Sequence, residues 1–181
     1  MLTRRPRTVR ESRQLERDEA VVAWRFWRLD ASDEGATRLI SPYQGVRWEV
    51  GEPLIARCLA PQLTPGPSGH RQHAPDEKCR CGIYGGTYRD LRSFIETNLV
   101  RPATLPVLGR VSLWGTVIGE NASWRASFAA PERLLVPTFL SGAFTIASEL
   151  EAYHVPVAVL SVRDIFTALH PSGHAPFTPL G

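Results

Sequence analysis

Four residues near the middle of the chain have side chains that commonly bind transition metals. Cys58, His73, Cys79 and Cys81 follow the spacing Cys-x14-His-x5-Cys-x-Cys and include all three cysteines of the chain. Three thiolates and one imidazole form a ligand set that is typical of tetrahedral structural zinc sites. Because Cys79 and Cys81 are two residues apart, both sulfurs point to the same side of an extended segment and can share one ion. We therefore predict a structural zinc site with these four ligands.

The segment 60–78, which separates Cys58 from Cys79, gives such a site a structural role. It contains four prolines and two glycines, which exclude a long helix or a central strand. Structureless loops of this length are uncommon in compact domains, and ordering one costs about 1–2 kcal/mol of backbone entropy per residue. A structural zinc site contributes on the order of 10–16 kcal/mol of binding free energy in small peptides. We expect a long loop stapled by the metal, and four protein ligands leave no open catalytic position.

Other interpretations of these residues remain open at this point. Cys58 could be a small buried core residue, and Cys79 with Cys81 could be a redox pair, although a disulfide across one residue would be strained. His70 is as near in sequence as His73 and could take its place as a ligand. The alternative function is an enzyme that uses a reactive cysteine or a metal-bound centre around Cys79, Cys81 and His73.

Known enzyme motifs do not fit the chain. His73 is followed by alanine and proline rather than by the x-Glu of zinc deaminases, and the cysteines lack the Pro-Cys-x-x-Cys spacing. The glycine-rich segment 82–86 precedes a predicted helix, but it lacks the Lys and Ser/Thr of a phosphate-binding loop, so we interpret it as a turn. The sequence favours a non-enzymatic binding module over an enzyme.

The positive charge of the chain is concentrated at its N-terminus. The formal net charge is +3, and the first ten residues carry +4 through Arg4, Arg5, Arg7 and Arg10. Such an arm can contact the phosphates of a nucleic acid or an acidic protein, and the simpler alternative is a solvated terminus. Trp114 is out of phase with the apolar residues of its predicted strand, so it could face outward as a recognition residue or lie on a covered face of the sheet.

Periodicity predicts an α+β fold that positions these residues. We expect a small, mostly antiparallel curved sheet or partly open barrel, with one or two packed helices and the metal-stapled loop. Thr87 and Asp90 have the spacing of a helix cap, and Gly115 inside a strand indicates a bulge. The predicted strands cover 20–29, 37–40, 54–59, 107–118 and 124–129, and the last two form a hairpin that is followed by a short element at 131–136. The predicted helices cover 87–99, 143–153 and 161–169. The expected organisation is a basic, disordered arm at 1–19, a single domain at 20–169 and a flexible tail at 170–181.

Length and composition restrict the class of protein. The chain has 181 residues, of which 43% are hydrophobic and 22% charged, which suits a folded domain. No apolar run is long enough to span a bilayer, and the N-terminus lacks the apolar stretch of a signal peptide. We therefore expect a cytoplasmic protein without membrane contact, in a reducing environment that keeps cysteines free.

The order of these motifs resembles a group of short proteins from actinobacteria and Bacillus-like bacteria for which we know no established activity. The resemblance covers roughly residues 24–135 and the segment 153–157. It implies a shared fold and a shared metal site, and it implies no reaction and no catalytic residue. The residues that carry it are Cys58, His73-Ala74-Pro75, Cys79-Arg80-Cys81-Gly82-Ile83-Tyr84, the segment 109–117 (GRVSLWGTV) and Trp124-Arg125-Ala126.

Overall fold

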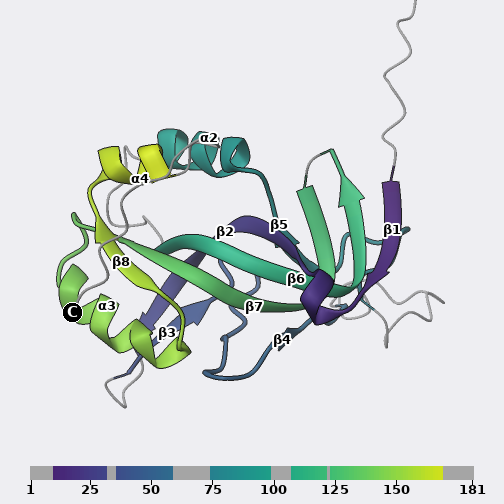
Figure 1. Ribbon diagram of the computed structural model, residues 1–181, viewed down its shortest axis with the longest axis horizontal. Helices are drawn as coiled ribbons and strands as arrows, with labels where there is room; N and C mark the ends of the chain where they lie inside the picture. The colour runs from purple at the N-terminus through teal and green to yellow at the C-terminus, as the bar shows by residue number, and fades with distance from the viewer. Residues whose placement is uncertain (1–9, 32–35, 59–73, 99–106, 122, 169–181) are drawn as a thin grey trace, which may run out of the picture.

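Two long antiparallel strands, β6 (Val107–Glu120) and β7 (Ser123–Pro137), form the centre of the fold (Figure 1). The structure is a computed structural model that describes residues 10–31, 36–58, 74–98, 107–121 and 123–168. The predicted hairpin is confirmed and is longer than expected, because β7 includes the segment 131–136 that we expected as a separate short element. These strands provide the positions to which every other strand pairs, directly or through β2.

The described strands form one open, eight-stranded sheet. Its main path runs β3-β2-β6-β7-β4, with β1 paired to β6 and with β5 and β8 paired to β7. All pairs are antiparallel except β7 with β8. The predicted α+β class and mostly antiparallel sheet are therefore confirmed. The further strands are β1 (Arg10–Leu15), β2 (Val21–Ala31), β3 (Thr37–Ile40), β4 (Leu54–Ile55), β5 (Ile83–Gly85) and β8 (Val157–Leu160).

The helices pack on both sides of the sheet. Helices α2 (Tyr88–Asn98) and α4 (Val162–Ala168) lie on one side, and α3 (Ala143–Leu150) lies on the other (Figure 1). The predicted cap of α2 is present, since Asp90 Oδ2 accepts hydrogen bonds from Thr87 N at 2.8 Å and from Thr87 Oγ1 at 2.7 Å. Short 3-10 turns cover Arg17–Glu19 and Glu151–Tyr153. None of the helices that the structure describes is long and apolar enough to span a membrane.

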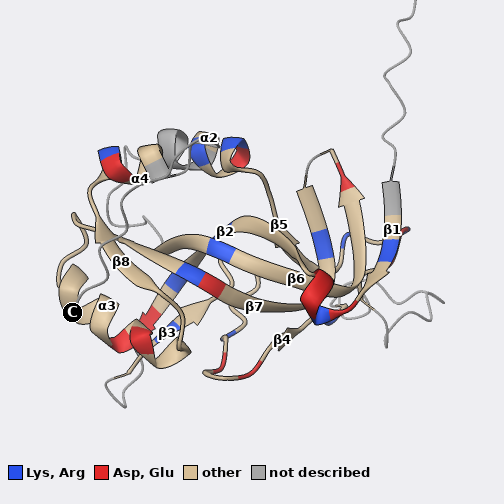
Figure 2. Cartoon of the chain, viewed as in Figure 1, with Lys and Arg blue, Asp and Glu red and all other residues tan. Residues whose placement is uncertain are grey.

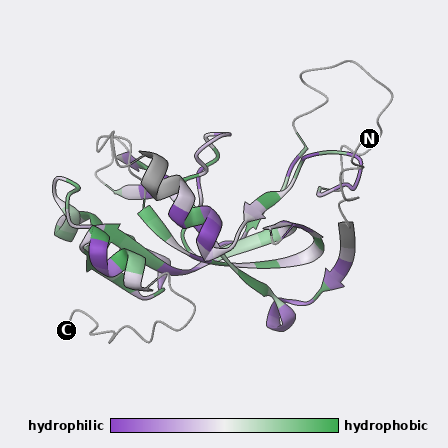
Figure 3. Cartoon of the chain, turned by 90° about the horizontal axis from the view of Figure 1, so that it is seen from above, coloured by the Kyte–Doolittle hydropathy of each residue, from purple (hydrophilic) through white to green (hydrophobic). Residues whose placement is uncertain are grey.

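Alternation along the strands builds two hydrophobic cores. Val107 and Leu134 belong to the core beside α3, whereas their neighbours Leu108 and Leu135 belong to the core beneath α2 and α4. Successive side chains of a strand point to opposite faces, so each strand contributes to both cores. Figure 3 shows the hydrophobic residues running along these strands. The sheet is thus buried on both faces in this region, which explains why β6 and β7 contain so many apolar residues.

Three strands differ from the expectation. β1 occupies residues 10–15 of the predicted disordered arm, so that prediction was wrong for this segment. β5 lies within the glycine-rich segment 82–86 that we interpreted as a turn. β8 lies between the predicted helices 143–153 and 161–169, where we predicted no strand. Each of these short strands exists through its pairing with β6 or β7, which no local pattern shows.

Replacement of Gly109 by alanine tests the close packing of the central strands. A Cβ atom at this position would lie 2.0 Å from the backbone oxygen of Arg133, so β6 and β7 would have to separate. We expect Gly109→Ala to lower the free energy of unfolding by about 2–3 kcal/mol. Gly45→Ala is the control, because a Cβ there has no neighbour within 4 Å and the cost is limited to about 1 kcal/mol of backbone strain at positive φ. Equal urea midpoints for the two variants would contradict this packing.

Candidate metal centre

Three cysteine sulfurs converge at one end of the sheet. The Sγ atoms of Cys58, Cys79 and Cys81 all lie within 4.8 Å of one another, and those of Cys58 and Cys79 are 3.7 Å apart. None of the three cysteines forms a disulfide. The structure therefore brings together three of the four predicted ligands, in a group that could hold a metal ion. The fourth, His73, and its alternative His70 lie outside the described residues.

Strand β7 brings these distant cysteines together. Cys58 follows β4, which pairs with β7 at Phe128 and Ala129, and Cys81 precedes β5, which pairs with β7 at residues 124–126. The backbone N–H of Ala56 extends the β4 side by donating to Ser127 O at 2.8 Å. Two segments that are more than 20 residues apart in sequence thus lie beside consecutive positions of one strand.

Local turns shape the segment that carries Cys79 and Cys81. The backbone N–H of Cys79 donates to Asp76 O at 3.1 Å, and Ser127 Oγ fixes the start of the segment by donating to Ala74 O at 2.8 Å. Gly82 follows with a φ of 122°, a conformation that side chains disfavour. A Cβ at Gly82 would also lie about 3 Å from side chains on both sides. Glycine at this position therefore lets the chain turn away directly after Cys81.

Arg125 of β7 anchors the same segment from inside the protein. Its side chain is buried, with a residual exposure of 4%. Nη1 donates to the carbonyl oxygens of Cys79 at 2.7 Å, Cys81 at 2.8 Å and Asp76 at 3.3 Å. Sequence reasoning missed this residue, because an arginine in a strand is usually a surface residue. No local pattern marks it as buried, because its burial comes from the cysteine segment that packs against β7.

The thiol of Cys81 lies in a weakly solvated environment. Burial raises the pKa of the Cys81 thiol to about 12; the neighbouring thiols of Cys79 and Cys58 add to this rise, and a backbone hydrogen bond from Asp76 opposes it. Without a bound cation, Cys81 stays protonated at neutral pH. A metal ion that binds here must displace that proton, because the thiolate is the form that coordinates metals.

The residues that we considered for partner binding lie elsewhere. Trp114 is only 9% exposed: its ring stacks on Phe128 at 5.9 Å between centroids, and the guanidinium of Arg17 lies 5.2 Å from its centre. Of the two alternatives for Trp114, the structure supports the covered position and excludes an outward-facing recognition residue, because a neighbouring ring and a cation cover it. Arg10 begins β1, and Arg4, Arg5 and Arg7 lie outside the described residues.

The described elements carry charges of both signs. Figure 2 shows basic and acidic residues scattered together along the strands and helices.

Known proteins add no information about function, because no family model, no curated protein and no solved structure matches this chain. The resemblance to short bacterial proteins therefore stays a prediction.

Replacement of Arg125 tests the anchoring of the cysteine segment. Arg125→Met keeps most of the side-chain volume but leaves the carbonyls of Cys79 and Cys81 without this donor. We expect the free energy of unfolding to fall by about 3 kcal/mol, since a buried unsatisfied acceptor costs about 1–3 kcal/mol. Arg28→Met, at an exposed position of β2, is the matched control and should change it by less than about 0.5 kcal/mol. Coincident urea unfolding curves for wild type and Arg125→Met would show that the contact contributes nothing.

Proposed function

We propose that this chain is a non-enzymatic binding module in which Cys58, Cys79, Cys81 and His73 hold a structural zinc ion. The separation of the sulfurs is the observation that carries the proposal. Two sulfurs bound to one tetrahedral zinc at about 2.3 Å lie about 3.8 Å apart, and the Cys58 and Cys79 sulfurs are 3.7 Å apart. A disulfide is excluded at that distance, since its bond length is about 2.05 Å. A thiol–thiol hydrogen bond has a similar length, so metal content decides between the two.

The charge of Arg125 supports the same ligand set. Its guanidinium is buried against the carbonyls of Cys79 and Cys81, and the described residues place no carboxylate on it. Three thiolates, one neutral imidazole and Zn²⁺ together carry one net negative charge. A buried cation beside that centre would balance this charge, whereas beside three neutral thiols it has no counterion. Charge balance therefore favours the metal-bound form of the cluster.

The alternative function, an enzyme with a reactive cysteine, has no comparable support. A nucleophilic cysteine needs a lowered pKa, usually from a nearby cation or a helix N-terminus. Burial instead raises the pKa of Cys81. A metal held by four protein ligands also leaves no position for a substrate. We therefore assign the cysteines a structural role, which fits cysteines without disulfide bonds in the reducing environment of the cytoplasm.

The proposed partner is an acidic macromolecule, either a nucleic acid or an acidic protein, that contacts the arginines of the N-terminal arm. The support is the concentration of positive charge in the first ten residues, in a chain whose remaining residues are close to neutral. The buried position of Trp114 removes the aromatic contribution that we considered for base stacking.

Metal analysis of the purified protein tests the zinc site. We expect about one zinc per chain in protein purified without added metal, and loss of that zinc with a large fall in melting temperature in Cys79→Ser and in Cys81→Ser. Ser148→Ala, at an exposed position of α3, is the control that should keep both metal and melting temperature. The proposal would be refuted if the purified wild-type protein contained no metal and a chelator left its melting temperature unchanged.

The same preparation identifies the fourth ligand. His73→Ala should release zinc to a competing chelator much faster than wild type, and His70→Ala should not. The reverse result would assign the imidazole to His70 and correct only this ligand.

Binding of short single- and double-stranded oligonucleotides at increasing salt tests the proposed partner. If the arm contacts phosphates, the logarithm of affinity falls linearly with the logarithm of salt, with a slope of about −0.9 per contact on duplex DNA. Replacement of Arg4, Arg5 and Arg7 by serine should therefore reduce the slope by up to about three. Binding that is absent at low salt, or unchanged in the triple variant, would exclude the nucleic-acid partner.

A further inference from the structure

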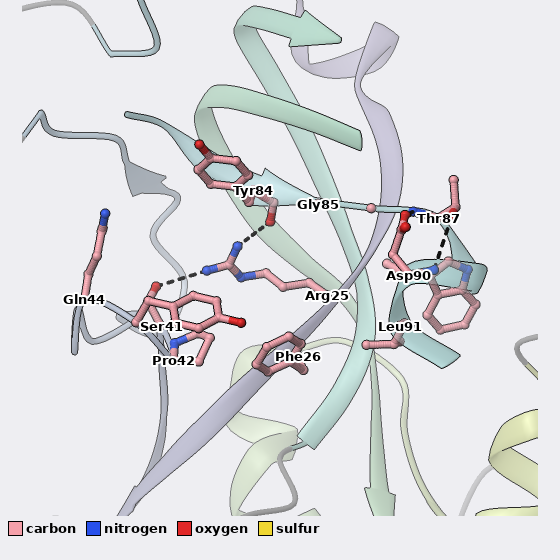
Figure 4. Close-up of a pocket in the computed structure, with 13 residues that line it drawn as sticks. Arg25, Phe26, Ser41, Pro42, Gln44, Tyr84, Gly85, Thr87, Asp90 and Leu91 are labelled. Atoms are coloured by element: carbon pink, nitrogen blue, oxygen red, sulfur yellow. Dashed lines mark hydrogen bonds between the residues drawn. The ribbon is translucent and has the colours of Figure 1, made fainter. Parts of the chain in front are cut away.

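A pocket of about 330 Å³ lies between β2, the segment after β3 and the start of α2. Its floor is formed by Trp24, Arg25 and Phe26, and none of the three cysteines lines it. Figure 4 shows Phe26 below the Arg25 side chain, with Ser41, Pro42 and Gln44 on one side and Thr87 and Asp90 on the other. The size suits a small organic molecule of one or two rings, since ligand pockets begin at about 300 Å³.

The walls of this pocket are fixed by hydrogen bonds and ring contacts. Trp24 and Gly86 exchange two backbone hydrogen bonds of 2.8 and 2.9 Å, which join the floor to the wall that leads into α2. On the opposite side, the ring of Tyr43 meets the ring of Phe26 edge to face, with centroids 6.0 Å apart. The pocket is therefore formed before any ligand arrives, and such preorganisation favours binding.

Arg25 places a positive charge in this mostly apolar space. Nη1 donates to the carbonyl oxygen of Tyr84 and Nη2 donates to Ser41 Oγ at 3.2 Å, so both partners are neutral (Figure 4). The guanidinium also lies 5.3 Å from the centre of the Trp48 ring. These contacts use two of its five N–H donors, and Nε is buried without a hydrogen-bond partner.

The charge of Arg25 has no counterion among the described residues. The one carboxylate that lines the pocket is Asp90, and its Oδ2 already accepts both hydrogen bonds of the Thr87 cap. Burial lowers the pKa of Arg25 to about 10, with Tyr43 opposing this effect, so the guanidinium is still charged at neutral pH. A partly buried cation without a carboxylate is costly, and an anion that enters the pocket would offset the cost.

The aromatic residues that line the pocket indicate which uncharged part a ligand would have. The rings of Trp24, Phe26 and Tyr43 line the space, and Tyr43 is 84% exposed, so its ring is accessible to a bound molecule. Aromatic side chains favour stacked or edge-to-face contact with a planar ring. A guanidinium prefers a carboxylate or a phosphate, because its planar donors match their oxygens.

We propose that this pocket binds a small planar aromatic molecule with one anionic group, with its ring against Trp24, Phe26 and Tyr43 and its anion at Arg25. The residues that line this ligand site are distinct from those of the metal centre, and its test needs no knowledge of the bound metal. The shared chemistry covers aromatic carboxylates and aromatic phosphate esters, and the experiment below distinguishes them.

Calorimetric titration of the full chain with three probes tests the proposal. The probes are 1-naphthoate, 1-naphthyl phosphate and the neutral 1-naphthamide. We expect one anionic probe per chain, bound at least about tenfold more tightly than the amide, because a charge-assisted hydrogen bond contributes about 1.5–3 kcal/mol. Tighter binding of the phosphate assigns phosphate esters, and tighter binding of naphthoate assigns carboxylates. Equal affinity for the amide, or no binding of either anion at millimolar concentration, would overturn the proposal.

Two variants distinguish a specific contact with Arg25 from the effect of the protein's overall positive charge. Arg25→Met should lose at least about tenfold in affinity for the anionic probe, whereas Arg28→Met, which removes an exposed arginine of the same strand outside the pocket, should bind like wild type. Equal losses in both variants, or none in Arg25→Met, would refute the assignment.

The variant Tyr43→Ala tests the same pocket if Arg25→Met does not fold. The exposed ring of Tyr43 is not part of either hydrophobic core, so its removal leaves the fold intact. We expect this variant to bind all aromatic probes several-fold more weakly while it still prefers the anion over the amide. Unchanged affinity would show that the ligand does not occupy this pocket.

Discussion

The buried contact between Arg125 and the carbonyls of Cys79 and Cys81 is the interaction on which this end of the fold depends. The guanidinium is 4% exposed and holds both carbonyls at less than 3 Å. It fixes the backbone of two cysteines to β7, while the pairing of β4 with the next positions of β7 places Cys58 beside them. Because this arrangement is set by β7, the three sulfurs meet even though their segments are distant in sequence. A cation at that point would add ligand bonds to a geometry that the sheet already provides.

Strand β5 connects the cysteine cluster with the pocket. Cys81 lies two residues before β5, and Tyr84 within β5 contacts both sides: its hydroxyl donates to Arg80 O at 2.6 Å, and its carbonyl accepts from Arg25. Gly85 lies so close to β2 that a Cβ would approach Ala23 Cβ to 2.6 Å. A metal that holds the Cys79–Cys81 segment would therefore also hold one wall of the pocket. We interpret the two sites as separate in chemistry but joined by one strand.

Local patterns in the sequence were enough for the hairpin, the Thr87 cap and the bulge at Gly115, because alternation, capping chemistry and a glycine inside a strand act over a few residues. Ligand chemistry was enough to predict that the three cysteines meet. The short strands β1, β5 and β8 could not be predicted, since each is stabilised by pairing with a distant strand. Arg125 and Arg25 were missed for a related reason: the burial of an arginine depends on what packs over its strand, which only the tertiary structure shows.

X-ray absorption spectroscopy at the zinc edge, on protein purified without added metal, tests the central claim most directly. The account predicts a first shell of three sulfurs at about 2.3 Å and one nitrogen at about 2.0–2.1 Å, with one sulfur lost in Cys58→Ser. A shell of oxygen and nitrogen alone, or a sample without a zinc edge, would contradict the convergence of these cysteines on one metal ion.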